Sequence, residues 1–399
     1  MTNDMTRGRI LPQLISFTIP LVLGNLFQLT YNAADSMIVG RYLGGQALAA
    51  VGTAGPIMNL AILFISGMCM GAGILMSTQY GAKQQDVLER QISTTLLSGL
   101  VFSFFVTLSM MVLAKPVLTL IRVPEEILDS ACGYLRIIFT GFLFTFAYNF
   151  FSSTLRALGD SKASLYFLVI SSVFNIAGDL LFVAVFRWGV NGSALATVLS
   201  QMICCLCCMI YIQKKVPLLR LGKRWLIFDK CLLSRTFSFG ITSALQLMCV
   251  QLGKVCVQSM VNMQGIAFMA AFTAVNRVDD FALTPQQNIA HAATTFMAQN
   301  KGAGQEKRMK QGFFCGVLVE LCYTAAVGIC VFLFAEPIMK LFLPEESAEV
   351  IVLGVTYLHL ISFLYLLSGS GNIVQGFFRG IGDLKVTLIS SLLNISVRV

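Results

Sequence analysis

Charged residues are scarce in this chain, since Asp, Glu, Lys and Arg make up only 12% of its 399 residues. A soluble protein normally carries about a quarter charged residues. Hydrophobic residues reach 56%, and the mean hydropathy is +0.78. This composition excludes an ordinary soluble domain and predicts a membrane protein of long apolar helices.

Common enzyme motifs are also missing. The sequence has no Walker A loop, no GxSxG nucleophile motif and no HExxH metal motif. We therefore expect no enzymatic activity and no cofactor, and any transport should draw its energy from an ion gradient. No histidine lies near the cysteine run at 204–208, so we interpret those cysteines as packing residues and not as a metal site.

The net charge of +9 does not indicate nucleic-acid binding, because the basic residues alternate between loops. One set of loops holds nineteen Lys and Arg, and the other holds five, namely Arg41, Lys115, Arg122, Arg187 and Lys340. Cytoplasmic loops of membrane proteins are enriched in Lys and Arg. We therefore expect a multi-pass protein of the inner (plasma) membrane, surrounded by lipid, with its N-terminus in the cytoplasm.

Apolar runs long enough to cross a bilayer recur along the chain. A transmembrane helix needs about 20 apolar residues. The predicted spans are 13–39, 47–80, 91–113, 131–155, 163–186, 191–213, 236–260, 266–299, 312–334, 351–378 and the start of another at 386.

Two motifs occur twice, about 220 residues apart. Residues 114–127 (AKPVLTLIRVPEEI) resemble 335–347 (AEPIMKLFLPEES), and 155–162 (LRALGDSK) resemble 378–385 (FRGIGDLK). A duplicated membrane unit predicts two packed halves of parallel topology. We assign 1–213 to an N-lobe, 214–235 to a cytoplasmic linker and 236–399 to a C-lobe. The C-lobe is expected to be incomplete, giving about 10–11 of 12 helices, because 177–222 has no counterpart.

The acids within apolar spans are the informative residues, because a charge at a span centre costs about 2.5–3.5 kcal/mol. Asp35 follows Gln28 and Asn32 at helical spacing, so the three share one face. The alternative is an interfacial acid near the helix end. Pro20 should bend this helix, because proline removes a backbone hydrogen bond.

A second polar group lies in the fifth and sixth spans. Asn175 and Asp179 are one turn apart, and Thr197 lies in the middle of the next span. Oxygen ligands of this kind suit a proton or Na⁺. The alternative is a buried hydrogen-bond network that only joins helices.

Further polar residues are candidates to line a cavity. Besides Gln28 and Asn32, these are Tyr31, Arg277, Asp279, Asp280 and His359. Arg277 is close enough in sequence to form a structural ion pair with either acid, and a lone His is more often a packing residue. Glu320 has no partner that the sequence identifies.

Segments throughout the chain resemble the multidrug and toxic compound extrusion (MATE) family, in its prokaryotic, DinF-like branch. They are PLVLGNLFQLTYNAADSMIVGRYLG, GTAGPI…STQYGAK, LRALGDSK and TAVNRVDDF…TFMAQNKGAG. The resemblance implies an all-α membrane fold of two six-helix lobes related by pseudo-twofold symmetry. It also implies that Asp35, Asn175, Asp179 and Thr197 form an N-lobe cation site and that Pro20 is the bending proline. The seventh span lacks the acid that other members use.

The resemblance implies export of organic cations in exchange for H⁺ or Na⁺, and we expect a monomer that binds no nucleic acid. Two alternatives remain open. A flippase for lipid-linked precursors of the same superfamily would carry anionic cargo and need a basic cavity. A non-transporting membrane scaffold would need no ion site.

Overall fold

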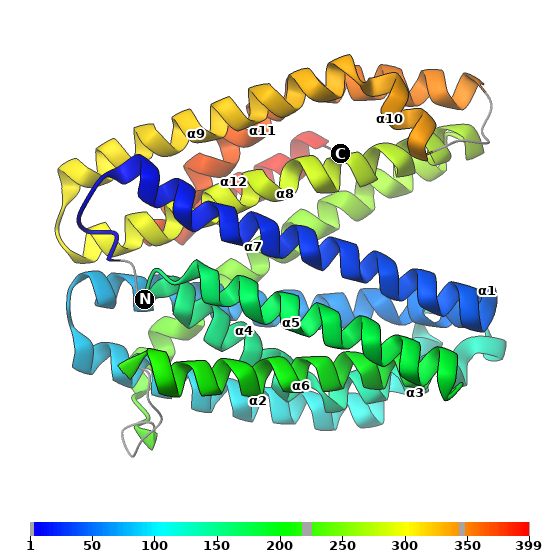
Figure 1. Ribbon diagram of the computed structural model, residues 1–399, viewed down its shortest axis with the longest axis horizontal. Coiled ribbons are helices and arrows are strands. Elements are labelled where there is room, and N and C mark those ends of the chain that lie inside the picture. The colour runs from blue at the N-terminus through cyan, green and yellow to red at the C-terminus, as the bar shows by residue number, and fades with distance from the viewer. Residues whose placement is uncertain (1–3, 218–225, 343–347, 399) are drawn as a thin grey trace. The chain divides into compact units, whose positions relative to one another are not determined.

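The computed structural model describes residues 4–217, 226–342 and 348–398, and within them the chain is helical without a β-strand (Figure 1). The predicted all-α fold is confirmed. The α-helices are α1 (Ile10–Gly81), α2 (Gln85–Leu120), α3 (Glu125–Thr140), α4 (Phe142–Ala157), α5 (Ser161–Asp179), α6 (Val190–Lys215), α7 (Lys230–Asn262), α8 (Ile266–Gly302), α9 (Glu306–Leu333), α10 (Ala335–Phe342), α11 (Ala348–Gly380) and α12 (Leu384–Arg398). A π-helical segment, η1 (Leu180–Val185), follows α5.

Parts of two predicted features lie outside the described residues. These are 218–225 of the linker, with three of its basic residues, and 343–347 of the second motif copy. Among the described helices, seven are long and apolar enough to cross a membrane, or eight if the bent pair α3–α4 is one span. The helix α8 is not among them, and it carries Arg277, Asp279 and Asp280.

Glycines mark the places where helices break or bend. The long helix α1 contains the first two predicted spans, and Gly44 separates them with φ 83°, a conformation that glycine adopts at no steric cost. The helices α3 and α4 meet at Gly141 with a bend of 47°. A Cβ atom at Gly141 would lie 2.6 Å from Val198 of α6, so glycine permits the close approach at this bend.

The chain divides into two compact units. The first consists mainly of Leu23–Ala244. The second combines Met5–Val22 with Leu245–Val399. The first turns of α1 therefore belong to the second unit, where Phe17 packs in a buried cluster with Phe296 of α8.

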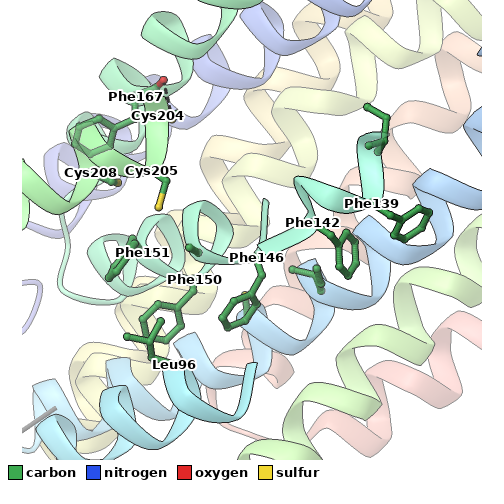
Figure 2. Packing of buried hydrophobic residues seen from close by; sticks show 14 of the residues in the cluster. Leu96, Phe139, Phe142, Phe146, Phe150, Phe151, Phe167, Cys204, Cys205 and Cys208 are labelled. Atoms are coloured by element: carbon green, nitrogen blue, oxygen red, sulfur yellow. Dashed lines mark hydrogen bonds between the residues drawn. The ribbon is translucent and has the colours of Figure 1, made fainter. Parts of the chain in front are cut away.

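The core of the first unit is rich in aromatic side chains (Figure 2). The helices α3, α4 and α5 all pack on α6, and α2 packs on α3 and α4. Phe146 and Phe150 stack within α4, with ring centroids 5.9 Å apart. Cys204 of α6 is buried there and donates its thiol hydrogen to the Phe167 carbonyl oxygen at 3.2 Å. The cysteine run thus contributes packing residues to this core.

The second unit is organised around α11, which contacts α8, α9, α10 and α12. Its buried cluster joins Val275 of α8, Met339 of α10 and Tyr365 of α11. Each of these side chains is at most 2% exposed. Because α11 touches so many elements, its residues decide much of the packing in this unit.

The repeated LRALGDSK and FRGIGDLK motifs form the same turn in both units. The Asp160 amide donates to the Leu155 carbonyl, and the Asp383 amide donates to the Phe378 carbonyl, both at 2.9 Å. The preceding glycines are both left-handed, with φ 85° and 82°. Each aspartate then accepts a hydrogen bond from an amide of the first turn of the next helix, α5 or α12, as an N-cap residue does.

Candidate cation and proton site

The helices α5 and α6 approach closely beside the predicted polar residues. A Cβ atom at Gly178 would lie 2.9 Å from Ala196 Cβ, so only a residue without a side chain fits there. This contact brings Asn175 of α5 next to Thr197 of α6. The Asn175 amide nitrogen donates to the Thr197 hydroxyl at 3.2 Å.

Asp35 reaches the same pair of helices from α1. The Ser193 hydroxyl donates to Asp35 Oδ1 at 3.0 Å. Asp179 lies within electrostatic reach of Asp35 and beside Ser193. The two acids that the sequence singles out therefore converge on one serine of α6, one helical turn before Thr197.

Several acceptor atoms of this group lack a well-formed hydrogen bond from the described residues. Asp179 is fully buried beside Ser193, yet neither of its carboxylate oxygens accepts a hydrogen bond of good geometry. The Asn175 side-chain oxygen is buried and likewise lacks such a bond. Burying an ionised carboxylate without compensation is expensive, because the charge loses its hydration. The arrangement therefore favours a bound proton or small cation between these oxygens.

The backbone is irregular next to the buried acid. The π-helical segment η1 begins at Leu180, directly after Asp179, and the Phe186 amide bonds the Leu181 carbonyl at 2.9 Å. Single π-helical turns within helices are frequent at functional sites. Here the regular α-helix ends at Asp179, the buried acid that meets Asp35 and Ser193.

Two tyrosines lie near the acids. Tyr134 of α3 is 3% exposed and within electrostatic reach of both Asp35 and Asp179. Tyr31 of α1 hydrogen-bonds Gln28 and lies near Asp35. Sequence reasoning missed Ser193 and Tyr134. Helical spacing four residues before Thr197 is a signal that would have found Ser193, whereas nothing in the sequence distinguishes Tyr134.

The remaining candidates on the first helix are less enclosed. Gln28 and Asn32 are exposed, whereas Asp35 is half-buried. Pro20 lies within α1, and the backbone around it keeps helical geometry, since the non-helical residue in this helix is Gly44. A bending role for Pro20 stays a prediction.

The candidates of the second unit have partners of their own. The Tyr365 hydroxyl donates to Asp279 at 2.5 Å, and Lys254 pairs with Asp280 at 3.5 Å. These partners come from α11 and α7. His359 bonds the Phe332 carbonyl at 3.2 Å and packs against that ring with centroids 4.5 Å apart.

Comparisons with known proteins agree on one family. A family model described as MatE matches residues 20–181 and 242–399. The chain is 32% identical over 397 residues to the "Probable multidrug resistance protein YpnP" of Bacillus subtilis (strain 168), covering 98% of this chain and 87% of that protein. It is 31% identical to the "Probable multidrug resistance protein YoeA" of the same strain, covering 98% and 86%.

The fold also has close structural neighbours. A solved structure described as the outward-facing conformation of a multidrug resistance MATE family transporter of the MOP superfamily aligns with a TM-score of 0.91. The sequences are 22% identical, and the alignment covers 99% of this chain and 88% of that one. At this identity the likeness shows a shared fold.

Proposed function

Because the chain belongs to the MatE family of multidrug efflux transporters, we propose that it is an antiporter that exports organic cations in exchange for H⁺ or Na⁺. Members of the family move small organic molecules across membranes and are not enzymes. The protein itself is a multi-pass membrane protein. The identities of the coupling ion and of the cargo are what we propose here.

The observation that carries the proposal is the meeting of Asp35 and Asp179 at Ser193. Two carboxylates this close repel each other when both are ionised, and a proton or Na⁺ between them removes that repulsion. An ion that binds one conformation of the unit better than another shifts the balance between them. One charge that crosses 100 mV releases about 2.3 kcal/mol, which supplies energy for export without a nucleotide.

The charges within the helices favour cationic cargo. Anionic cargo would require embedded basic side chains, but Lys254 is paired with Asp280. Tyr31 offers an aromatic ring beside Asp35, and aromatic faces attract organic cations. In this proposal the protein is a monomer of the inner membrane with a cytoplasmic N-terminus, because the richly basic loops face the cytoplasm.

The test is efflux of ethidium from cells that express the full-length protein. We expect Asp179→Asn and Asp35→Asn to abolish efflux, while Asp129→Asn, an exposed acid of α3 paired with Lys115, retains it. Proteoliposomes given separate pH and Na⁺ gradients then identify the coupling ion. Wild-type efflux by Asp179→Asn would contradict the proposal.

A further inference from the structure

A row of small residues on α9 is interrupted by one acid. Gly312, Gly316, Glu320, Thr324 and Gly328 follow one another at four-residue spacing, and all are buried. Residues at this spacing share one helix face. Gly316 lies against Ile373 of α11, and a Cβ atom at Gly328 would lie 2.7 Å from the Ser362 carbonyl oxygen. From Gly316 to Gly328 the row forms a tight seam with α11 that includes Glu320, whereas Gly312 lies against Phe296 of α8.

The Glu320 carboxyl has no partner in this seam. Its side chain is fully buried, and neither oxygen takes part in a hydrogen bond with any residue that the structure describes. A Cβ atom at Gly369 of α11 would lie 2.4 Å from the Thr324 methyl carbon and 2.9 Å from Glu320 Oε1, so a larger residue there would collide with both side chains. The Thr324 hydroxyl, one turn further along α9, donates to the Leu321 carbonyl at 3.2 Å and is thus already engaged.

Burial dominates the environment of the carboxyl, and the structure records no charge interaction on Glu320 from the described residues of the neighbouring helices. Tyr323 is a titratable neighbour within electrostatic reach of Glu320, and the Tyr323 hydroxyl donates to the Ala282 carbonyl of α8 at 3.0 Å. The acids of α8 have partners elsewhere: Asp279 accepts from Tyr365, and Asp280 pairs with Lys254.

The internal repeat shows what occupies the same place in the first unit. The turns before α2 and α9 have the same hydrogen bond, from Gln84 to Gln79 and from Gln305 to Asn300, both at 3.0 Å. These two turns are 221 residues apart, and the same spacing aligns Glu320 with Gly99. The LRALGDSK and FRGIGDLK turns are 223 residues apart, and this spacing aligns Gly369 with Phe146.

The two units fill this position in opposite ways. In the first unit the Phe146 ring of α4 lies directly over Gly99 of α2. In the second unit the ring is replaced by Gly369 and the glycine by Glu320. A phenyl ring fills the space between the helices without burying a charge. An isolated carboxylate in the same place is strongly unfavourable in free energy when it is ionised. Packing alone therefore does not account for the acid.

We propose that Glu320 is a second proton-binding group, within the second unit, that takes up and releases a proton during transport. A proton fits better than a metal ion, because a metal ion needs several ligand atoms, whereas neither Glu320 oxygen has a polar partner among the described residues. Release requires water to reach the carboxyl, so it requires α9 to separate from α11 along the glycine seam. The transport part of this proposal rests on the antiport function proposed above.

The protonation state of Glu320 can be tested without a transport assay. Infrared spectra of the purified full-length protein at neutral pH should show a protonated carboxyl band that Glu320→Gln removes and Asp179→Asn leaves in place. A hydrophobic carbodiimide, to which a protonated carboxyl adds through its oxygen and its proton to form an O-acylisourea, should label Glu320 and not the exposed Glu336 of α10. An ordinary glutamate is protonated in roughly one molecule in 500 at pH 7, so we expect at least about a hundredfold difference in labelling.

The role in transport is tested with a packing control. The triple variant Glu320→Gly, Thr324→Ser, Gly369→Phe reproduces Gly99, Ser103 and Phe146 of the first unit and also removes the methyl group that a ring at 369 would meet. We expect it to fold and to lose most pH-driven efflux, while Glu320→Asp retains part of it. Absence of the band together with absence of labelling, or wild-type efflux by the triple variant, would overturn the proposal. If the wild type shows no ion-driven efflux, the antiport proposal fails while the infrared result still decides whether Glu320 binds a proton.

Discussion

Ser193 donates a hydrogen bond to Asp35, a residue that precedes it by 158 positions, with an oxygen–oxygen distance of 3.0 Å. This bond ties α6 to α1 at the point where Asp179 also approaches. A hydroxyl that donates to a carboxylate stabilises its ionised form. Ser193 thus influences how readily the acid pair gains and loses its ion.

Removing this hydroxyl should change coupling without unfolding the protein. A hydrogen bond to a charged group contributes about 1.5–3 kcal/mol, and every 1.4 kcal/mol is a tenfold change in an equilibrium constant. We expect Ser193→Ala to shift the ion concentration for half-maximal efflux by roughly tenfold or more. Ser200→Ala is the matched control, because Ser200 lies on the same helix and donates to a backbone carbonyl. Equal behaviour of the two variants would exclude a special role for Ser193.

The coupling ion should stabilise the folded protein, because it binds the native acid pair and not the unfolded chain. At about 100 times its dissociation constant a ligand adds roughly 2.7 kcal/mol. If Na⁺ drives efflux, NaCl should raise the thermal unfolding temperature more than choline chloride does, and Asp179→Asn should remove the difference. If Na⁺ drives efflux but does not change the unfolding temperature, the assignment of the Na⁺ site to this acid pair is contradicted.

The two copies of the repeated turn should differ in stability. Asp160 accepts from the Ala163 amide at 3.1 Å and from the Tyr211 hydroxyl at 2.7 Å. Asp383 accepts from the Val386 amide at 3.4 Å and is exposed. Loss of a helix cap costs about 0.5–2 kcal/mol, and the half-buried Tyr211 hydroxyl, left without its acceptor, adds at most about 1–3 kcal/mol. We expect thermal unfolding to show a larger loss for Asp160→Ala than for Asp383→Ala, and the reverse order would contradict this account.

An exposed ion pair on α10 predicts a small pH effect. The hydrogen bond from Lys340 at 2.6 Å, together with its charge, lowers the pKa of Glu336. A lowered pKa means that the pair stabilises the fold above the unfolded value of about 4.3. This contribution is lost as the pH falls through the lower folded value. The difference in unfolding temperature between wild type and Glu336→Gln should be constant above about pH 5 and vanish in acid, while efflux stays unchanged.

Much of the architecture follows from local sequence patterns. Runs of apolar residues predict the helices, because a helix in lipid satisfies all of its backbone hydrogen bonds internally. Helical spacing places Asn175 and Asp179 on one face before any contact is known. The repeated LRALGDSK motif indicates a duplicated unit, and both copies form the same turn because glycine and aspartate supply the local geometry.

Contacts between residues that are distant in the chain could be identified only from the folded structure. Periodicity identifies the face on which Asp35 or Glu320 lies, but it does not say which helix covers that face. Packing brings Ser193 and Tyr134 to the acid pair. It also pairs Asp280 with Lys254 and places Glu320 opposite Gly369. Residue types and spacing determine where charges enter the membrane, whereas only contacts between helices determine which of those charges are compensated.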